Sequence, residues 1–428
     1  MSALARFNTL KVAARTSSFS FKGKEVGLKE IGAALNVATV LEGSVHKSGD
    51  RLRIRAQLSD VATGYQLWSE SYDRQLTDIF AVQDEITARI IDALQLHLHE
   101  EVSRPAATSR LADPEVYEIV LRGRYHWNQR SPDGFAKAAE LFQEATKRAP
   151  QYAPAYSGLA DVYLSQFDYG LLSWDESTVR ARAAATKALE LDDTSAAAHT
   201  SFAHILLHEW QWQGAEQHFQ RAFELDPNYT LALHWYALSQ TALGRTDEAI
   251  KAMRRAQQLD PLSVRINADL GMAYLAAGQY EEAVAQEGRA LDLAPDSAAP
   301  RWIRGMALEQ LKRFKDAELD MKFAFDAWSG DTSIKGSLGH LYAVSGRQAE
   351  ARKLLTELTT QKGATDVAFF AALICAGLND TNGALEWLEH AVDERSGSVR
   401  YLKIDPRLAG LRDEPRYRQL IERVGLPP

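Results

Sequence analysis

Two histidines on one expected helix are the residues best spaced for metal chemistry. His204 and His208 are four positions apart, so a helix presents both on one face, with Glu209 adjacent. Imidazole nitrogens at this spacing could hold a metal ion. No third ligand is evident in the sequence, and histidine readily occupies polar faces, so the pair is interpreted as a surface feature. We therefore expect no metal and no cofactor, and a metalloenzyme built on this pair is the weakest function considered.

Three arginines form a second group. Arg51, Arg53 and Arg55 alternate along an expected strand and so point to one side of it, while Leu52 and Ile54 point to the other. Such a row could meet an acidic surface or a nucleotide phosphate. The favoured interpretation is the solvated face of a half-buried antiparallel strand, with the acidic part of the chain as one candidate partner.

Sequence motifs of common enzymes do not occur. The chain has no Gly-x-x-x-x-Gly-Lys-Ser/Thr loop, no Gly-x-Gly-x-x-Gly after a strand and no His-Glu-x-x-His. Its single cysteine, Cys375, excludes an intrachain disulfide and a cysteine-ligated zinc cluster, and it favours the cytoplasm. No catalytic domain is recognisable, so we expect a protein that is not an enzyme.

Charge and hydropathy narrow the class of partner. The formal net charge is −8, and all of the excess negative charge lies beyond residue 104, which argues against nucleic acid as a partner. The longest uncharged apolar run spans residues 367–378, shorter than the roughly 18 to 20 residues that a bilayer requires. We therefore expect no membrane insertion.

A repeat of 34 residues dominates the remainder of the chain. Prolines recur at this period at positions 227, 261 and 295, and alanines recur in register with them (Ala215, Ala249, Ala283 and Ala317, then Ala222, Ala256, Ala290 and Ala324). Small residues recur where two helices approach closely. Apolar residues at helical spacing precede glycine-containing turns at Gly278 and Gly346. Each unit is therefore predicted to be a helix, a short turn and a second helix.

Period and motif together resemble the tetratricopeptide repeat. Leu270-Gly-Met-Ala-Tyr274 and Leu338-Gly-His-Leu-Tyr342 carry its Leu-Gly-x-x-Tyr pattern, followed by an alanine and a closing proline. The resemblance extends over residues 115–395 and predicts a superhelix of about eight units. The second unit has about nine extra residues, which we assign to a long apolar turn at residues 167–176. We expect that turn to pack on a neighbouring repeat, with contact to a partner as the alternative.

The resemblance also implies a binding face. In this family the inner groove is lined by set positions of each first helix, which here correspond to Thr200, His204, His208, His234, Leu238, Arg265, Met272, Trp302 and Met306. Only Arg265 is basic, so a clamp for a peptide carboxylate is not expected. The soft or flat side chains of Met272, Trp302 and Met306 suit an apolar peptide or a partner's helix. Packing between helices is an equal alternative for each apolar position.

The first hundred residues have a different pattern. We expect a strand at residues 10–16, a helix at 28–35, a β-hairpin over 42–62 with its turn at Gly49, a third strand at 66–72 and an amphipathic helix from 79 to 97. This mixture predicts a small α/β domain whose sheet is covered by the last helix.

Short sequence stretches in this region, such as Val40-Leu-Glu-Gly-Ser-Val45 and Leu67-Trp-Ser-Glu-Ser-Tyr-Asp73, resemble the TolB-like amino-terminal domain of bacterial regulators. In such regulators that domain joins repeats to an adenylate cyclase or winged-helix domain. Family members carry an earlier strand and helix, so the domain looks truncated here, and a misassigned start codon explains this equally well. An incomplete sheet could leave a strand edge for a homodimer or for a partner's strand.

We thus expect a mostly α protein, a tetratricopeptide-repeat α-solenoid preceded by a small α/β domain. The expected division is a truncated TolB-like domain at 1–103, a linker at 104–114, the superhelix at 115–395 and a capping segment at 396–428. The favoured function is a non-catalytic scaffold in bacterial signalling that binds a protein or peptide partner in its groove. The alternative is the regulatory half of an adenylate or guanylate cyclase whose catalytic domain lies outside this chain.

Overall fold

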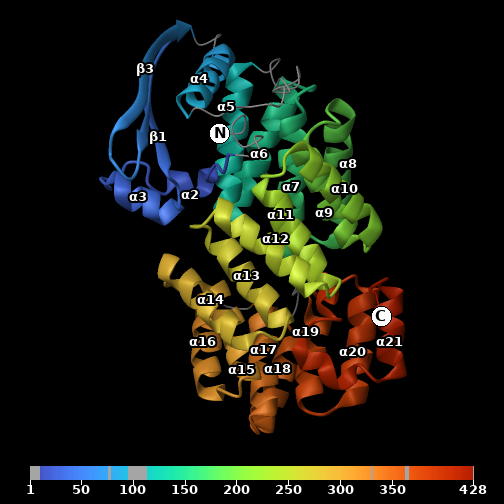
Figure 1. The fold of residues 1–428 in the computed structure, drawn as a ribbon. Helices are drawn as coiled ribbons and strands as arrows, with labels where there is room; N and C mark the ends of the chain where they lie inside the picture. Colours follow the sequence, from blue (N-terminus) through green and yellow to red (C-terminus); the bar gives the residue numbers. More distant parts are fainter. Residues whose placement is uncertain (1–9, 76–78, 95–112, 329–330, 362–365, 428) are drawn as a thin grey trace.

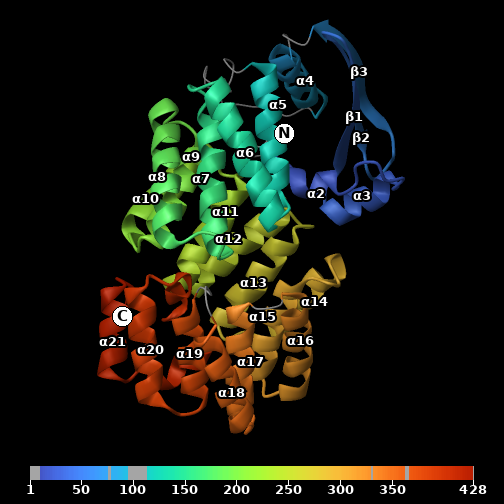
Figure 2. The same ribbon diagram turned by 180° about the vertical axis from the view of Figure 1, so that it is seen from behind.

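A computed structural model describes residues 10–75, 79–94, 113–328, 331–361 and 366–427 of the 428-residue chain. A small sheet with short helices lies at the amino-terminal end, and an array of paired helices forms the rest (Figures 1 and 2). This is the expected fold class. No helix among the described residues is long and apolar enough to span a bilayer.

The amino-terminal part is a three-stranded antiparallel sheet with one helix on its apolar face. Its elements are α2 (Arg15–Phe19), α3 (Leu28–Leu35), β1 (Thr39–Ser48), β2 (Arg51–Asp60), β3 (Gln66–Gln75) and α4 (Ile79–Ala93). The strands follow the order β1-β2-β3, and Ser48 pairs with Arg51 across the hairpin turn. Leu52, Ile54 and Tyr72 are buried with Val82 of α4. The predicted hairpin, third strand and covering helix are therefore confirmed, with residues 95–97 of that helix outside the described residues.

The expected strand at residues 10–16 is wrong. Leu10 and Val12 do pack beside Leu58 and Ile90, but their backbone does not join the sheet, and the chain turns into α2 at Arg15. The segment instead binds the repeats: the Ala14 amide donates to the Leu259 carbonyl at 2.6 Å. The backbone of this segment thus forms hydrogen bonds with the solenoid in place of those with a sheet edge. Alternation of side chains along the sequence does not distinguish these two structures.

Eight helix pairs follow in the described part of the chain. They are α5 (Pro114–Asn128) with α6 (Pro132–Arg148), α7 (Ala153–Asp168) with α8 (Trp174–Leu191), α9 (Ala196–His208) with α10 (Trp212–Leu225), α11 (Thr230–Ala242) with α12 (Thr246–Leu259), α13 (Val264–Ala276) with α14 (Tyr280–Leu293), α15 (Ala298–Gln310) with α16 (Phe314–Ala327), α17 (Thr332–Val344) with α18 (Gln348–Thr359), and α19 (Val367–Gly377) with α20 (Thr381–Asp393). All eight alanines of the repeat register are fully buried. They lie where a larger side chain would separate the helices.

The turn inside each pair uses one residue in the left-handed backbone region. Gly278 has φ +73° and Gly346 has φ +87°, which glycine adopts without strain. The same conformation recurs one period after Gly278 at Lys312, with φ +59°, and two periods before Gly278 at Trp210, with φ +63°. The 34-residue period is therefore a backbone period, and it persists where glycine is absent.

The second unit differs from the expectation. Its extra residues do not form a long turn, because α7 continues to Asp168, α8 begins at Trp174, and both helices are longer than their equivalents in later pairs. The expected packing on a neighbour is confirmed, since the ring of Phe167 lies edge-on to His208 of α9, with centroids 5.3 Å apart.

The carboxyl-terminal residues do more than cap the stack. Residues 396–411, here called the C-terminal segment, contain two 3-10 helices, η3 (Gly397–Tyr401) and η4 (Pro406–Leu411). Val399, Leu402 and Leu408 in this segment are fully buried. The final helix α21 (Pro415–Arg423) packs on α20, and the Trp212 indole N–H at the start of α10 donates to the Val424 carbonyl at 2.9 Å. Figures 1 and 2 show this end of the chain returning to the middle repeats.

Candidate functional site

The surface of interest is formed by the first helices of the pairs, which pack on one another along the array. We call it the inner face. It is lined by α7, α9, α11, α13, α15 and α17, and the C-terminal segment lies against it through contacts with Asp168 of α7 and Ser337 of α17. Three groups of polar side chains follow one another along this face.

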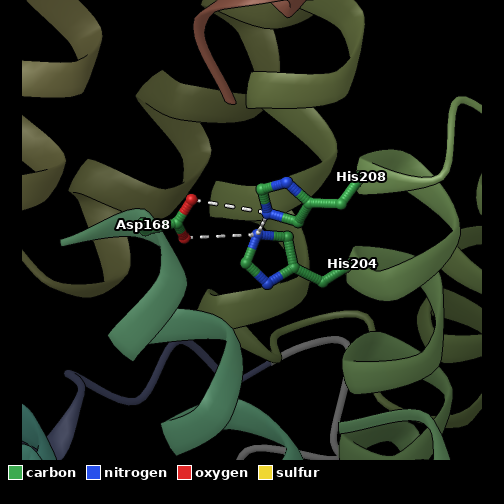
Figure 3. A group of neighbouring side chains, drawn as sticks. All are labelled: Asp168, His204 and His208. Carbon is green, nitrogen blue, oxygen red and sulfur yellow. Dashed lines mark hydrogen bonds and ion pairs between the residues drawn. The ribbon is translucent and has the colours of Figure 1, made fainter. Parts of the chain in front are cut away.

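The first group is Asp168, His204 and His208 (Figure 3). The two histidine Nε2 atoms are 3.2 Å apart, and the Asp168 carboxylate lies 3.4 Å from His208 Nε2 and 3.8 Å from His204 Nε2. Both imidazoles are buried, whereas Asp168 keeps 24% of its side chain exposed. The ring of His204 stacks on Trp235 at a centroid distance of 4.0 Å. The two rings are therefore held side by side, with the carboxylate facing both.

Burial and charge decide the protonation of this group. Burial and the neighbouring His208 bring the pKa of His204 well below its ordinary value. Burial lowers the pKa of His208 to about 4, against the opposing effect of Asp168. For Asp168 burial opposes ionisation, but His208 and Arg400 more than offset it and lower its pKa to about 2. Near pH 7 the group is a carboxylate beside two neutral imidazoles.

Arg400 of η3 completes the surroundings of Asp168. Its guanidinium Nη1 lies 3.4 Å from Asp168 Oδ1, and the two side chains are 20% and 24% exposed. Gly397, three residues earlier, lies against Phe167. The end of α7 is thus joined to a part of the chain more than two hundred residues away.

The second group is His234, Arg265 and Asp269. The carboxylate of Asp269 accepts from Arg265 Nε at 2.7 Å and lies 2.6 Å from His234 Nε2. Burial would raise the pKa of Asp269, but the charge of Arg265 and the bond to His234 lower it to about 2. A buried carboxylate with two partners is satisfied within the fold. This group therefore orders the joint between α11 and α13.

The third group joins the C-terminal segment to α15 and α17. Ser337 Oγ accepts from the Trp302 indole N–H and from Arg407 Nη1, both at 2.9 Å. Arg407 also forms a buried ion pair with Asp405, with Nη2 and Oδ2 2.7 Å apart. Burial opposes ionisation of Asp405, but Arg407 lowers its pKa below the ordinary value. A buried ion pair with further hydrogen bonds fixes one geometry of the segment on the inner face.

The predicted groove residues do lie on the first helices, but most are covered. Thr200, His204, His208, His234 and Met306 are buried, so they do not form an open wall. Leu238, Met272 and Trp302 are partly exposed, and Arg265 is exposed over 42% of its side chain. The assumption that the histidine pair is a surface feature without a third neighbour is wrong, because neighbouring helices enclose it and Asp168 approaches from α7.

The three arginines of β2 lie where the alternation places them. Arg51, Arg53 and Arg55 are exposed on the face of the sheet opposite to α4. Arg53 Nε pairs with Asp73 Oδ1 of β3 at 3.0 Å, and that bond lowers the pKa of Asp73. The neighbouring strand therefore supplies one acidic partner for the row.

Sequence reasoning missed Asp168, Arg400, Asp405 and Arg407. Asp168 falls in the stretch where the sequence predicts a long turn, and the other three lie in the part for which it predicts only a cap on the stack. One signal was available for Asp168: it is acidic, yet it stands among the aromatic residues Phe167 and Tyr169. A charged residue in an apolar stretch has a partner as a rule.

Comparison with known proteins supports the repeat assignment. Two family models, each described as tetratricopeptide repeat, match residues 200–264 and 240–307. Among solved structures, a monomeric mutant of IFIT1 with m7Gppp-AAAA has a TM-score of 0.51 at 12% identity, covering 82% of this chain and 77% of that one. A tetratricopeptide repeat protein from Parabacteroides merdae has a TM-score of 0.44 at 15% identity, covering 63% and 98%. The IFIT1 likeness concerns the fold alone.

Two curated bacterial proteins are similar in sequence. "Putative adenylate cyclase 3" of Rhizobium meliloti is 34% identical over 204 residues, which is 47% of this chain and 34% of the relative. "Transcriptional regulator HilA" of Salmonella typhimurium is 25% identical over 143 residues, 33% of this chain and 26% of the relative. The matched regions span about a third and about a quarter of these relatives.

Proposed function

The chain contains tetratricopeptide repeats, and from this premise we propose that it is a non-catalytic scaffold that binds a protein or peptide partner on its inner face. Proteins built from such repeats mediate protein–protein interactions. We place this scaffold in the cytoplasm, in bacterial signalling or regulation. The net charge of −8 disfavours nucleic acid as its partner.

One observation carries the proposal: the inner face already holds a peptide segment, the chain's own residues 396–411. That segment is joined to the inner face by an ion pair at Asp168 and a hydrogen bond at Ser337, and its own Val399 and Leu402 are buried. A surface that binds one peptide segment through both polar and apolar contacts is suited to bind a second peptide segment of similar chemistry. The part left open, which includes Leu238, Arg265 and Met272, is where we place the partner.

Photo-crosslinking tests this placement without disturbing the buried groups. We expect benzoylphenylalanine at Met272, which is partly exposed on α13, to capture a partner in the native cell. The matched control carries the same group at Leu319, which is 71% exposed on the second helix α16. Capture at position 272 and not at 319 supports inner-face binding. Equal capture at both, or capture at 319 alone, refutes it.

A second candidate function rests on the similarity to the cyclase. The 34% identity over 204 residues favours a regulatory region of an adenylate cyclase as an alternative, with catalysis performed outside these residues. Sequencing the gene upstream of the first codon distinguishes the two. A continuous reading frame that encodes a cyclase domain supports the alternative, and a stop codon in frame before any such domain rejects it.

The sheet offers a site for self-association. Within the described residues β1 pairs on one side only, with β2, and Leu41 and Val45 on it are exposed. A free strand edge can pair with the same strand of a second copy. We propose a homodimer through β1, which sedimentation velocity checks by comparing the wild-type chain with Val45→Lys. A monomer at all concentrations contradicts this proposal and leaves inner-face binding untouched.

A further inference from the structure

The group of Asp168, His204 and His208 has a composition that peptide binding does not use. Two imidazoles and one carboxylate offer three ligand atoms that all lie within 4.8 Å of one another. In the described part of the chain, this is the one cluster of three or more histidine, cysteine or acidic side chains with that spacing. The ligands come from the end of α7 and from one face of α9.

The distances match those between neighbouring ligands of one metal ion. Ligands about 2.0 to 2.2 Å from a tetrahedral metal ion are separated from one another by about 3.3 to 3.6 Å. Here the separations are 3.2 Å between the two Nε2 atoms and 3.4 Å between His208 Nε2 and Asp168 Oδ1. The third separation, between His204 Nε2 and Asp168 Oδ2, is longer at 3.8 Å.

The surroundings hold the ligands in place. Trp235 stacks on His204, and Phe167 lies edge-on to His208, which restricts both rings. Arg400 contacts the same carboxylate from the side of the C-terminal segment, so its positive charge competes with a metal ion for this ligand. The exposed quarter of Asp168 provides a route from solvent.

We infer that Asp168, His204 and His208 bind a divalent transition metal ion of the Zn²⁺ class. Two imidazoles and one carboxylate suit Zn²⁺ and its neighbours rather than Ca²⁺ or Mg²⁺, which prefer oxygen ligands. Three protein ligands leave at least one position for water or for a group from a partner.

Calorimetric titration of Zn²⁺ into the chelator-treated full-length chain tests the inference, with Co²⁺ absorption as a second readout. We expect one ion per chain and the visible bands of a four-coordinate Co²⁺ site. Asp168→Asn and His208→Gln should each weaken binding by at least about tenfold. Arg400→Gln should tighten it several-fold, because a positive charge beside the carboxylate is removed while a hydrogen-bond donor is kept.

A second histidine pair provides the matched control. His199 Nδ1 and His218 Nδ1 are 2.9 Å apart, but no third ligand joins them among the described residues. We expect His218→Gln to leave Zn²⁺ affinity and the Co²⁺ spectrum unchanged. Circular dichroism checks that each variant folds. If His208→Gln does not fold, the result is decided by Asp168→Asn, which is nearly isosteric, and by Arg400→Gln, whose side chain reaches the surface.

Three outcomes overturn the inference. The first is that the wild-type chain does not bind Zn²⁺ stoichiometrically. The second is that Asp168→Asn binds Zn²⁺ as tightly as the wild type. The third is that His218→Gln loses Zn²⁺ binding while Asp168→Asn keeps it. A partner captured through Met272 in the absence of any bound metal would leave the scaffold proposal intact, so the two ideas fail separately.

Discussion

At the scale of single residues, Glu287 is the least expected side chain in the array. It lies fully buried on α14, neither carboxylate oxygen has a hydrogen-bond partner among the described residues, and a Cβ at Gly271 would stand 2.0 Å from Oε1. Burial, with a further effect of Asp269, raises the pKa of Glu287 well above its ordinary value of 4.5. The folded chain therefore keeps this carboxyl group protonated where the unfolded chain does not.

A pH dependence follows from Glu287. Its favourable contribution to stability is complete below about pH 4.5 and is lost as the pH rises to the folded-state pKa, since the unfolded chain releases the proton. The slope from this one group is about 1.4 kcal/mol per pH unit. We expect Glu287→Gln to remove that slope and to stabilise the fold at pH 7.

Urea unfolding between pH 5 and 8 checks this, with Glu282→Gln in the first turn of the same helix as control. If wild type and Glu287→Gln lose stability with pH in parallel, Glu287 is ionised in the folded chain and the argument from burial is wrong.

The histidine pair shows where prediction from sequence stops at this scale. The four-residue spacing of His204 and His208 predicts that both lie on one face of a helix. The structure confirms this for α9, because the positions of side chains around a helix depend only on local geometry. Their burial and their third neighbour depend on α7 reaching Asp168 and on η3 returning to it. Contacts between residues this far apart leave no local pattern to read.

At the scale of elements, helix α2 joins the two parts of the molecule. Ser17 is fully buried, its hydroxyl donates to Asp260, and it accepts from the Leu262 amide at 2.9 Å. The Ser17 amide also donates to Asp260 at 3.1 Å. A five-residue helix is too short to be stable alone, so these bonds to the turn between α12 and α13 hold it.

We expect Ser17→Ala to release the amino-terminal part from the repeats. Loss of the hydroxyl leaves the buried Asp260 carboxylate and the partly buried Leu262 amide with one partner fewer each, at a cost of about 1 to 3 kcal/mol. Hydrogen exchange should quicken over residues 14–20 and over the turn at 260–262. Ser18→Ala, one position along on the same helix and only partly buried, should exchange as the wild type does. Equal protection of both variants would show that the docking depends on other contacts.

The observed helices and strands show which features of the fold the sequence repeat predicts and which it does not. The helix pairs follow from the 34-residue period, because the second helix of each of four successive pairs, α10 to α16, buries two alanines at the same repeat positions. The strand expected at residues 10–16 failed because its alternating side chains fit a sheet or a packed irregular segment equally well, and hydrogen bonds to Leu259 and Asp260 decided between them. TolB-like membership of the first part, and the division into domains, stay predictions.

At the scale of the whole molecule, the array is closed on itself. Contacts join Asp168 to Arg400 and Trp212 to Val424, so the last residues bind repeats near the start. In an open solenoid each unit contacts only its neighbours. The return of the C-terminal segment adds contacts between distant units, and it could not be predicted from sequence because it depends on the curvature of the entire array.

We expect Trp212→Phe to loosen this closure. The change keeps an aromatic ring but removes the indole N–H that bonds the Val424 carbonyl, a loss of about 0.5 to 1.5 kcal/mol. Hydrogen exchange should quicken both in α21 and at the start of α10. Trp387→Phe in α20, whose ring contacts His390 of the same helix, is the control and should leave α10 unchanged. Faster exchange in α21 alone would mean that the two ends are not coupled.

The closure by residues 396–411 has a consequence for synthesis of the chain. The nascent chain emerges from the ribosome with its amino end first, so helices α5 to α12 emerge well before Arg400 and Arg407 are synthesised. Until then Asp168 and Ser337 lack these two partners. The nascent chain thus exposes its inner face for the whole interval between translation of the first repeats and translation of the last thirty residues or so.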